Sequence, residues 1–273
     1  MKRVLGHLAL LSFAASMTLT ALPVKADEHS DGHHEGTIDG ESTPADRVQI
    51  HPMFNAAAVD AGMVKVAFHL YDKTLKQTLD AESVDITHAA KVHVIIYDAS
   101  LQEYRHVHPS FQNGMWEVDV PLVQDGNYHL WTQGKVKADG GLWSTALEFT
   151  VVNGEAAHPQ IENLPSVLSG VDGISQVTLS NETLVVADAS TFTLSFSRLD
   201  GTFPELSPYL GALAHLLIVD SQGDQLVHAH PVEGYGDKMQ VTAWFPHAGS
   251  YRLWVEFNDG DFHRIVPLSI IVN

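Results

Sequence analysis

The chain has 273 residues, and its 33 acidic side chains outnumber its 15 lysines and arginines. This balance disfavours nucleic acid and anionic membranes as partners and favours cations. The sequence has 17 histidines and no cysteine, which excludes disulfides, a lipid-modified cysteine and a blue-copper centre with its thiolate ligand.

Residues 1–26 have the pattern of a signal peptide. Lys2 and Arg3 form a basic start, an apolar stretch follows from Val4 to Leu22, and Val24-Lys25-Ala26 resembles a cleavage site. A membrane anchor is the alternative, but the apolar stretch is short and interrupted. We therefore expect export to the periplasm and no membrane contact after cleavage.

Residues 27–47 have almost no apolar content and are predicted to be a disordered tail. Histidines and acidic residues are interleaved in this tail, a composition typical of metal capture. A solvated tail whose histidines have no function is the alternative interpretation.

From Val48 onwards the chain shows short segments rich in β-branched and aromatic residues, separated by turn signals. Examples are residues 63–71, 91–97, 116–120 and 147–152. No long stretch has a convincing helical period, so the sequence predicts an all-β fold.

The chain also repeats itself. Three segments recur in the same order in both halves: residues 92–98 and 214–220, residues 105–109 and 227–231, and residues 125–131 and 248–254. The repeat predicts a duplicated domain. We assign a first β-sandwich to residues 48–153, a linker rich in Gly, Pro, Ser and Asn to residues 154–174, and a second β-sandwich to residues 175–273.

Domains of roughly 100 residues with short strands have the size of immunoglobulin-like sandwiches. Tyr128 and Tyr251 each follow a glycine by two positions and are candidates for the tyrosine corner of such folds. A cupredoxin-like sandwich is the close alternative.

Each repeat carries three histidines at matching positions, with thirteen residues from the first to the second. A hairpin turn at Ala99-Ser100 would place His93 directly opposite His106, with His108 two residues further along the same strand. Residues two apart, and residues directly opposed, share one face of a sheet. The three side chains should therefore project from one surface patch, and the same reasoning gives His215, His228 and His230.

Three imidazoles at this spacing can converge on one ion with metal–nitrogen distances of about 2 Å. Imidazole suits copper(II) and zinc, so we expect a copper or zinc ion bound by His93, His106 and His108, and another bound by His215, His228 and His230. The structural alternative is that these imidazoles hydrogen-bond to backbone carbonyls. The sequence shows no Ser-His-Asp arrangement, paired carboxylates or nucleotide loop, so no enzymatic activity is predicted.

The second half contains Tyr209-Leu210-Gly211-Ala212, then His215-Leu216, then His228-Ala229-His230-Pro231, then a Pro-x-x-Gly-x-Tyr segment that ends at Tyr251. This pattern resembles the YtkA-like group of small exported bacterial sandwich domains. The resemblance covers roughly residues 192–272 and implies heavy-metal handling, chiefly of copper. The first half keeps His93, His106, His108 and Pro109 but lacks the Tyr-Leu-Gly-Ala segment.

The function predicted from these observations is that of a periplasmic protein that binds copper or zinc for scavenging, chaperoning or resistance. Its expected partners are divalent metal ions and another periplasmic metal-handling protein. The alternative is a structural or interaction module of tandem immunoglobulin-like domains in an exported complex, with structural histidines.

Overall fold

The computed structural model describes residues 47–273 except 88, 162–163, 181–183, 187–189 and 230–232. The predicted signal peptide and nearly all of the predicted tail lie outside these residues. Arg47, assigned to the disordered tail, is instead buried and forms ion pairs with Asp72 at 2.8 Å and Asp139 at 2.9 Å. Arg47 is therefore part of the first body.

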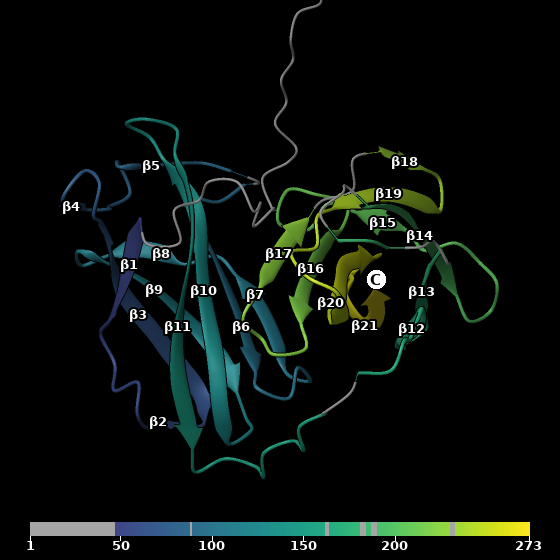
Figure 1. Ribbon diagram of the computed structural model, residues 1–273, viewed down its shortest axis with the longest axis horizontal. Coiled ribbons are helices and arrows are strands. Elements are labelled where there is room, and N and C mark those ends of the chain that lie inside the picture. The colour runs from purple at the N-terminus through teal and green to yellow at the C-terminus, as the bar shows by residue number, and fades with distance from the viewer. Residues whose placement is uncertain (1–46, 88, 162–163, 181–183, 187–189, 230–232) are drawn as a thin grey trace, which may run out of the picture. The chain divides into compact units, whose positions relative to one another are not determined.

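Four sheets form two β-sandwich-like bodies, which confirms the all-β prediction (Figure 1). The first body contains two of the sheets. One has the order β1 (Val48–Pro52), β3 (Gly62–Asp72), β9 (Met115–Leu122) and β8 (Ser110–Gln112), with β4 (Gln77–Thr78) paired to β3. The other has the order β2 (Val59–Asp60), β11 (Leu142–Val152), β10 (Gly126–Val136), β6 (Val92–Asp98) and β7 (Tyr104–Val107), with β5 (Val84–Asp85) paired to β10.

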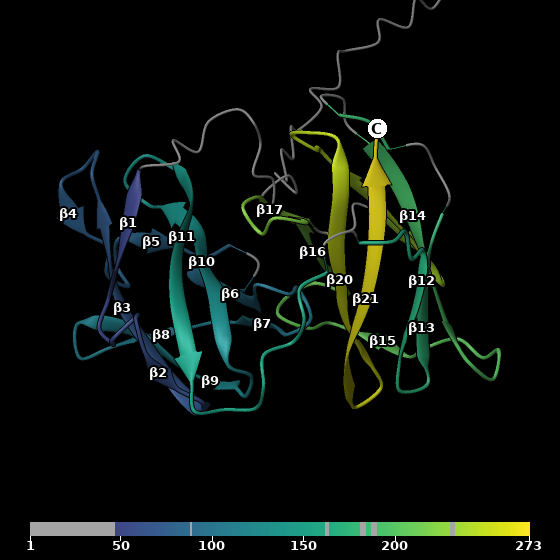
Figure 2. The same ribbon diagram turned by 60° about the horizontal axis from the view of Figure 1, so that its bottom comes forward.

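The second body contains the other two sheets. One has the order β12 (Ser169–Asp172), β13 (Ser175–Leu179), β14 (Ser190–Arg198), β19 (Lys238–Ala243) and β18 (Glu233–Tyr235). The other has the order β15 (Leu206–Ser207), β20 (Gly249–Asp259), β16 (His215–Asp220) and β17 (Leu226–Ala229), with β21 (Phe262–Val272) paired to β20. Figure 2 shows β20 and β21 as a long hairpin. Because β12 begins at Ser169, the predicted linker of residues 154–174 is shorter in the structure.

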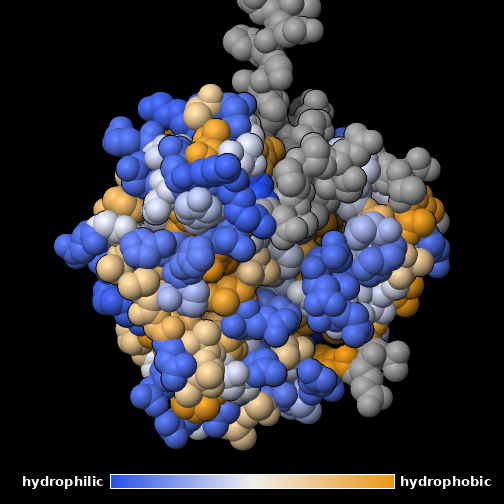
Figure 3. All heavy atoms as spheres, turned by 60° about the vertical axis from the view of Figure 1, so that its left-hand side comes forward, coloured by the Kyte–Doolittle hydropathy of each residue, from blue (hydrophilic) through white to orange (hydrophobic). Residues whose placement is uncertain are grey.

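Each body buries its own apolar core between its two sheets. Alternating strand residues supply both cores, as in β14, where Phe192, Leu194 and Phe196 are fully buried. Exposed apolar side chains lie scattered among hydrophilic ones on the face drawn in Figure 3, and scattered exposure of this kind is normal for a folded chain. Among the residues described, no helix is long and apolar enough to cross a membrane.

A third apolar cluster joins the two bodies, and the residues that form it belong to one compact unit of the chain. Four of its nine buried residues lie on β6 and β16, two strands that are buried along their whole length. On β6, Val94 and Ile96 face the core of the first body, while Ile95 and Tyr97 face the third cluster. His93 lies on the same side as Ile95 and Tyr97, because side chains alternate along a strand.

Both predicted tyrosine corners are present. The Tyr128 hydroxyl lies 3.0 Å from the carbonyl oxygen of Gln124 and also contacts the Glu103 carboxylate, and the Tyr251 hydroxyl donates to the carbonyl oxygen of His247 at 2.7 Å. Each contact with a carbonyl oxygen reaches four residues back along the chain and fixes the turn before the long strands β10 and β20.

Candidate metal centre

The β6–β7 hairpin sets the positions of the first histidine cluster. Its register pairs Val94 with Val107 and Ile95 with His106, so His106 does not lie opposite His93 as predicted. The connection is longer than the predicted turn because the Asp98 carboxylate accepts hydrogen bonds from the backbone of Gln102 and Glu103, each at 2.8 Å. The offset is two residues, which preserves the predicted face because strand side chains alternate with a period of two.

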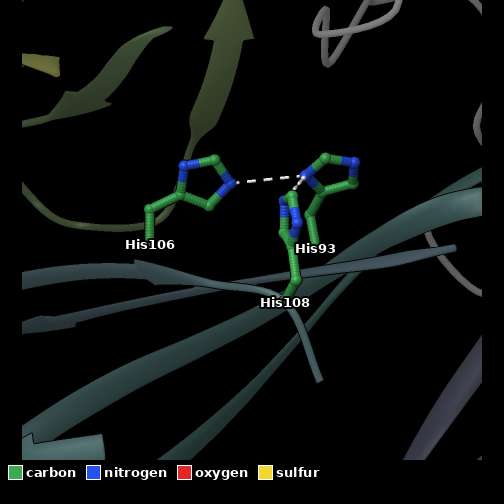
Figure 4. A group of neighbouring side chains, drawn as sticks. All are labelled: His93, His106 and His108. Atoms are coloured by element: carbon green, nitrogen blue, oxygen red, sulfur yellow. Dashed lines mark hydrogen bonds between the residues drawn. The ribbon is translucent and has the colours of Figure 1, made fainter. Parts of the chain in front are cut away.

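The three histidines of the first repeat converge, as Figure 4 shows. Nδ1 of His93 lies 3.3 Å from Nε2 of His106 and 3.1 Å from Nε2 of His108. All three ligand atoms lie within 4.8 Å of one another. Nitrogens bound tetrahedrally to one ion at about 2.0 Å are themselves about 3.3 Å apart. The cluster of His93, His106 and His108, named the first triad below, could therefore hold one metal ion with little movement.

Hydrogen bonds on the far side of two rings determine which nitrogens face the centre. Nε2 of His93 lies 3.0 Å from the Thr87 carbonyl oxygen, and Nδ1 of His106 lies 2.9 Å from a Glu256 carboxylate oxygen. A carbonyl and an ionised carboxylate only accept, so these outer nitrogens carry the hydrogens. When the rings are neutral, Nδ1 of His93 and Nε2 of His106 then have no hydrogen, and each carries a lone pair. These two nitrogens face each other at 3.3 Å, an arrangement that a bound metal ion would stabilise.

The first triad is buried and does not form the surface patch expected from the sequence. His93 is 2% exposed, His106 is 3% exposed, and His108 is half-buried. Burial, together with the neighbouring imidazoles of His106 and His215, lowers the pKa of His108 to about 4. This ring is consequently neutral at pH 7, the state in which histidine binds metal.

Glu256, on β20 of the second body, supports the first triad. Its Oε2 faces His106 and also accepts a hydrogen bond from the Tyr104 hydroxyl at 3.2 Å, while its Oε1 lies 3.0 Å from Nε2 of His263. Burial alone would raise the pKa of Glu256, but the bonds from His106 and His263 and their charges lower it to about 2. The buried carboxylate is therefore ionised at neutral pH.

His215 of the second repeat lies beside this centre. It is fully buried, and its ring centroid is 5.1 Å from that of His106. Its Nε2 lies 2.8 Å from the carbonyl oxygen of Tyr209, six residues earlier, just as His93 bonds to Thr87. His228 lies on β17 opposite Leu217, but its side chain and all of His230 fall outside the described residues. A second metal centre at His215, His228 and His230 stays a prediction.

Sequence reasoning missed Glu256 as a supporting residue. In the repeat, Glu256 corresponds to Gln133, because Gln133 pairs with His93 as Glu256 pairs with His215. This alignment marks position 256 as adjacent to the predicted second cluster. Its contact with His106 spans 150 residues and leaves no local pattern in the sequence.

Comparison with protein families finds one match. A family model described as "Domain of unknown function (DUF8832)" matches residues 169–273, less than half of the chain. No curated protein matches the sequence.

Distant similarities to solved structures lie among large bacterial proteins. A Salmonella alpha-2-macroglobulin mutant is 14% identical, with a TM-score of 0.25, over 85% of this chain and 15% of that one. The Escherichia coli adhesin FdeC is 13% identical, with a TM-score of 0.26, over 84% of this chain and 65% of that one. The D00-D0 domain of intimin is 10% identical, with a TM-score of 0.21, over 82% of this chain and all of that one. This chain thus spans less than two thirds of the macroglobulin and of the adhesin.

Proposed function

We propose that this protein binds copper or zinc in the periplasm and serves in metal scavenging, chaperoning or resistance. The observation that carries the proposal is the convergence of three imidazole nitrogens, two of them 3.1 Å and 3.3 Å from the third. Imidazole is a common ligand of copper(II) and zinc. The resemblance of the second half to YtkA-like exported domains and the excess of acidic residues add support.

The hydrogen bonds that orient the His93 and His106 rings also support metal binding. In metal sites, a ligating histidine usually donates its second N–H to a carboxylate or a backbone carbonyl, which fixes the tautomer and the ring orientation. His106 and His93 have these two kinds of partner in Glu256 and the Thr87 carbonyl. We infer a binding role without catalysis, which a redox assay on the copper-loaded protein would test.

The second candidate is a structural role, favoured by the location of the histidines beside the cluster that joins the two bodies. The His106–Glu256 pair, at 2.9 Å, is buried on both sides. In this case the histidines would hold the two bodies together and the protein would act as an interaction module. Metal affinity separates the two candidates.

The test compares the parent with the double variant His93→Ala/His108→Ala, which leaves the His106–Glu256 pair in place. We expect zinc and copper(II) to raise the melting temperature of the parent by mass action. Loss of two ligands should weaken binding at least about 100-fold, since loss of a supporting residue alone costs 10- to 100-fold. Chelator competition measures the affinity.

The control variant His51→Ala/His69→Ala removes another pair of histidines, which lie directly opposite each other on β1 and β3. All three proteins keep the predicted tail, so weak metal binding by the tail contributes equally to each measurement. Equal metal affinity in the parent and the triad variant would rule out the triad as the site.

Export is tested on the same protein. The chain recovered from periplasmic extract should begin at Asp27, and a chain with an intact Met1 in the membrane fraction would contradict export.

A further inference from the structure

We infer that Glu256 is a positioning residue that makes the first triad prefer a divalent ion, so that the second body completes the metal centre of the first. This inference rests on the proposed function. It names the charge class of the ion and assigns a role to a residue that is 150 positions away from its histidine partner.

The carboxylate of Glu256 is held by groups from both bodies. Oε2 faces His106 at 2.9 Å and Tyr104 at 3.2 Å, both on β7 of the first body. Oε1 faces His263 of β21 in the second body at 3.0 Å. The Glu256 side chain is 1% exposed, so its charge is shielded from water. These contacts hold the carboxylate in one orientation.

The hydrogen bond to Glu256 acts on the metal through the His106 ring. It keeps the hydrogen on Nδ1, so Nε2 carries the lone pair that can bind a metal, and it aims Nε2 at the other two imidazoles. A negative charge behind the ring also makes Nε2 a stronger donor. Glu256 therefore contributes to metal affinity without touching the ion.

The charge of Glu256 favours a higher charge on the ion. The attraction between two charges is proportional to their product and is strongest where water is excluded. A buried carboxylate consequently stabilises copper(II) or zinc about twice as strongly as copper(I) at the same position. The preference should depend on the charge of residue 256 and not only on its shape.

The fold itself does not demand an acid at this strand position. The first repeat carries the neutral Gln133 at the equivalent place, on β10 opposite His93. Glutamine matches glutamate in shape, so Glu256→Gln removes the charge and preserves the strand residue that the other repeat uses.

The test measures zinc and copper(I) affinities of the full chain and of Glu256→Gln by chelator competition. We expect zinc affinity to fall about 10- to 100-fold, as is typical for loss of a supporting carboxylate, and copper(I) affinity to fall less. Unchanged zinc affinity would overturn the positioning role. Equal losses for both ions would overturn the charge preference.

The matched control is Asp259→Asn, which removes another buried carboxylate from the same strand. Asp259 bonds to Arg198 and Ser175 instead of a histidine, so its loss should lower stability and leave metal affinity unchanged. If Asp259→Asn lowered zinc affinity as much as Glu256→Gln does, the effect would come from a general loss of stability and not from the contact with His106.

Nitrogen NMR of the metal-free parent tests the inference without any variant. His106 should carry its hydrogen on Nδ1, and a hydrogen on Nε2 in the neutral ring would overturn the inference. If the parent binds no metal while His106 shows the expected tautomer, the proposed function fails and the contact with Glu256 is structural. The two failures are thus distinguishable.

Discussion

Each buried histidine of the first triad has a specific partner on the side away from the centre. Buried polar groups are costly unless they are hydrogen-bonded. The Thr87 carbonyl satisfies His93, and the Glu256 carboxylate satisfies His106. The nitrogens on the inner side are left facing one another, which is the arrangement a bound cation would stabilise.

The tyrosine corner of the second body gives a prediction for one residue. Tyr251→Phe removes only the hydroxyl that donates to the His247 carbonyl at 2.7 Å. We expect the free energy of unfolding to fall by about 0.5–1.5 kcal/mol, the usual net contribution of one hydrogen bond. Urea denaturation measures the change, with metal affinity as an internal control that should not move. An unchanged midpoint would show that the corner does not contribute to stability.

The hairpins show how far sequence reasoning reaches at the scale of elements. Alternation along β6 and β7 correctly placed three histidines on one face, since this follows from the geometry of any strand. The register was wrong by two residues because it depends on the loop, where Asp98 accepts backbone hydrogen bonds from Gln102 and Glu103. Loop capping of this kind has only a weak sequence signature.

Burial of the triad was also missed, although the sequence held a signal for it. The unbroken apolar runs in β6 and β16 are typical of strands that are covered on both faces. An apolar run does not reveal which residues cover the strand face that points away from the body's own core. That answer comes from the packing of Tyr104 on Trp254, with ring centroids 4.7 Å apart, and distant contacts of this type leave no local pattern.

Asp259, the last residue of β20, links three strands of the second body through hydrogen bonds of its carboxylate. Arg198 at the end of β14 bonds to this carboxylate at 3.0 Å, and Ser175 at the start of β13 bonds to it at 2.7 Å. The bond from Arg198, with help from Ser175 and the Glu205 backbone, holds the pKa of Asp259 well below its usual range. The folded state therefore keeps this carboxylate ionised at a pH where the unfolded chain is protonated.

The stabilisation from Asp259 is present above the unfolded pKa of about 3.9 and is lost as the pH falls towards the lower folded value. Asp259→Asn should thus lower the free energy of unfolding at pH 7 by about 1–2 kcal/mol, the lower part of the range for a lost charged partner, because Arg198 is partly exposed. The deficit should shrink at pH 3. Denaturant unfolding at both values measures it, and an equal deficit at both would contradict the assigned linkage.

At the scale of the whole molecule, the two bodies differ in the residues that lie beside the third cluster. Each half has its own core, and the third cluster joins β6 of one body to β16 of the other. Glu256 stands at the strand position that Gln133 holds in the first repeat, and it contacts His106 of the other body. A metal ion bound at the first triad would therefore stabilise both the β6–β7 hairpin and its contact with the second body.

X-ray absorption of the zinc- or copper(II)-loaded full chain tests the central claim most directly, because it reports the atoms bound to the ion. The claim predicts tightly held metal with three imidazole nitrogens at about 2.0–2.1 Å, and loss of this imidazole signal in His93→Ala/His108→Ala. A shell made mainly of oxygen donors, or an imidazole signal that persists in that variant, would contradict it.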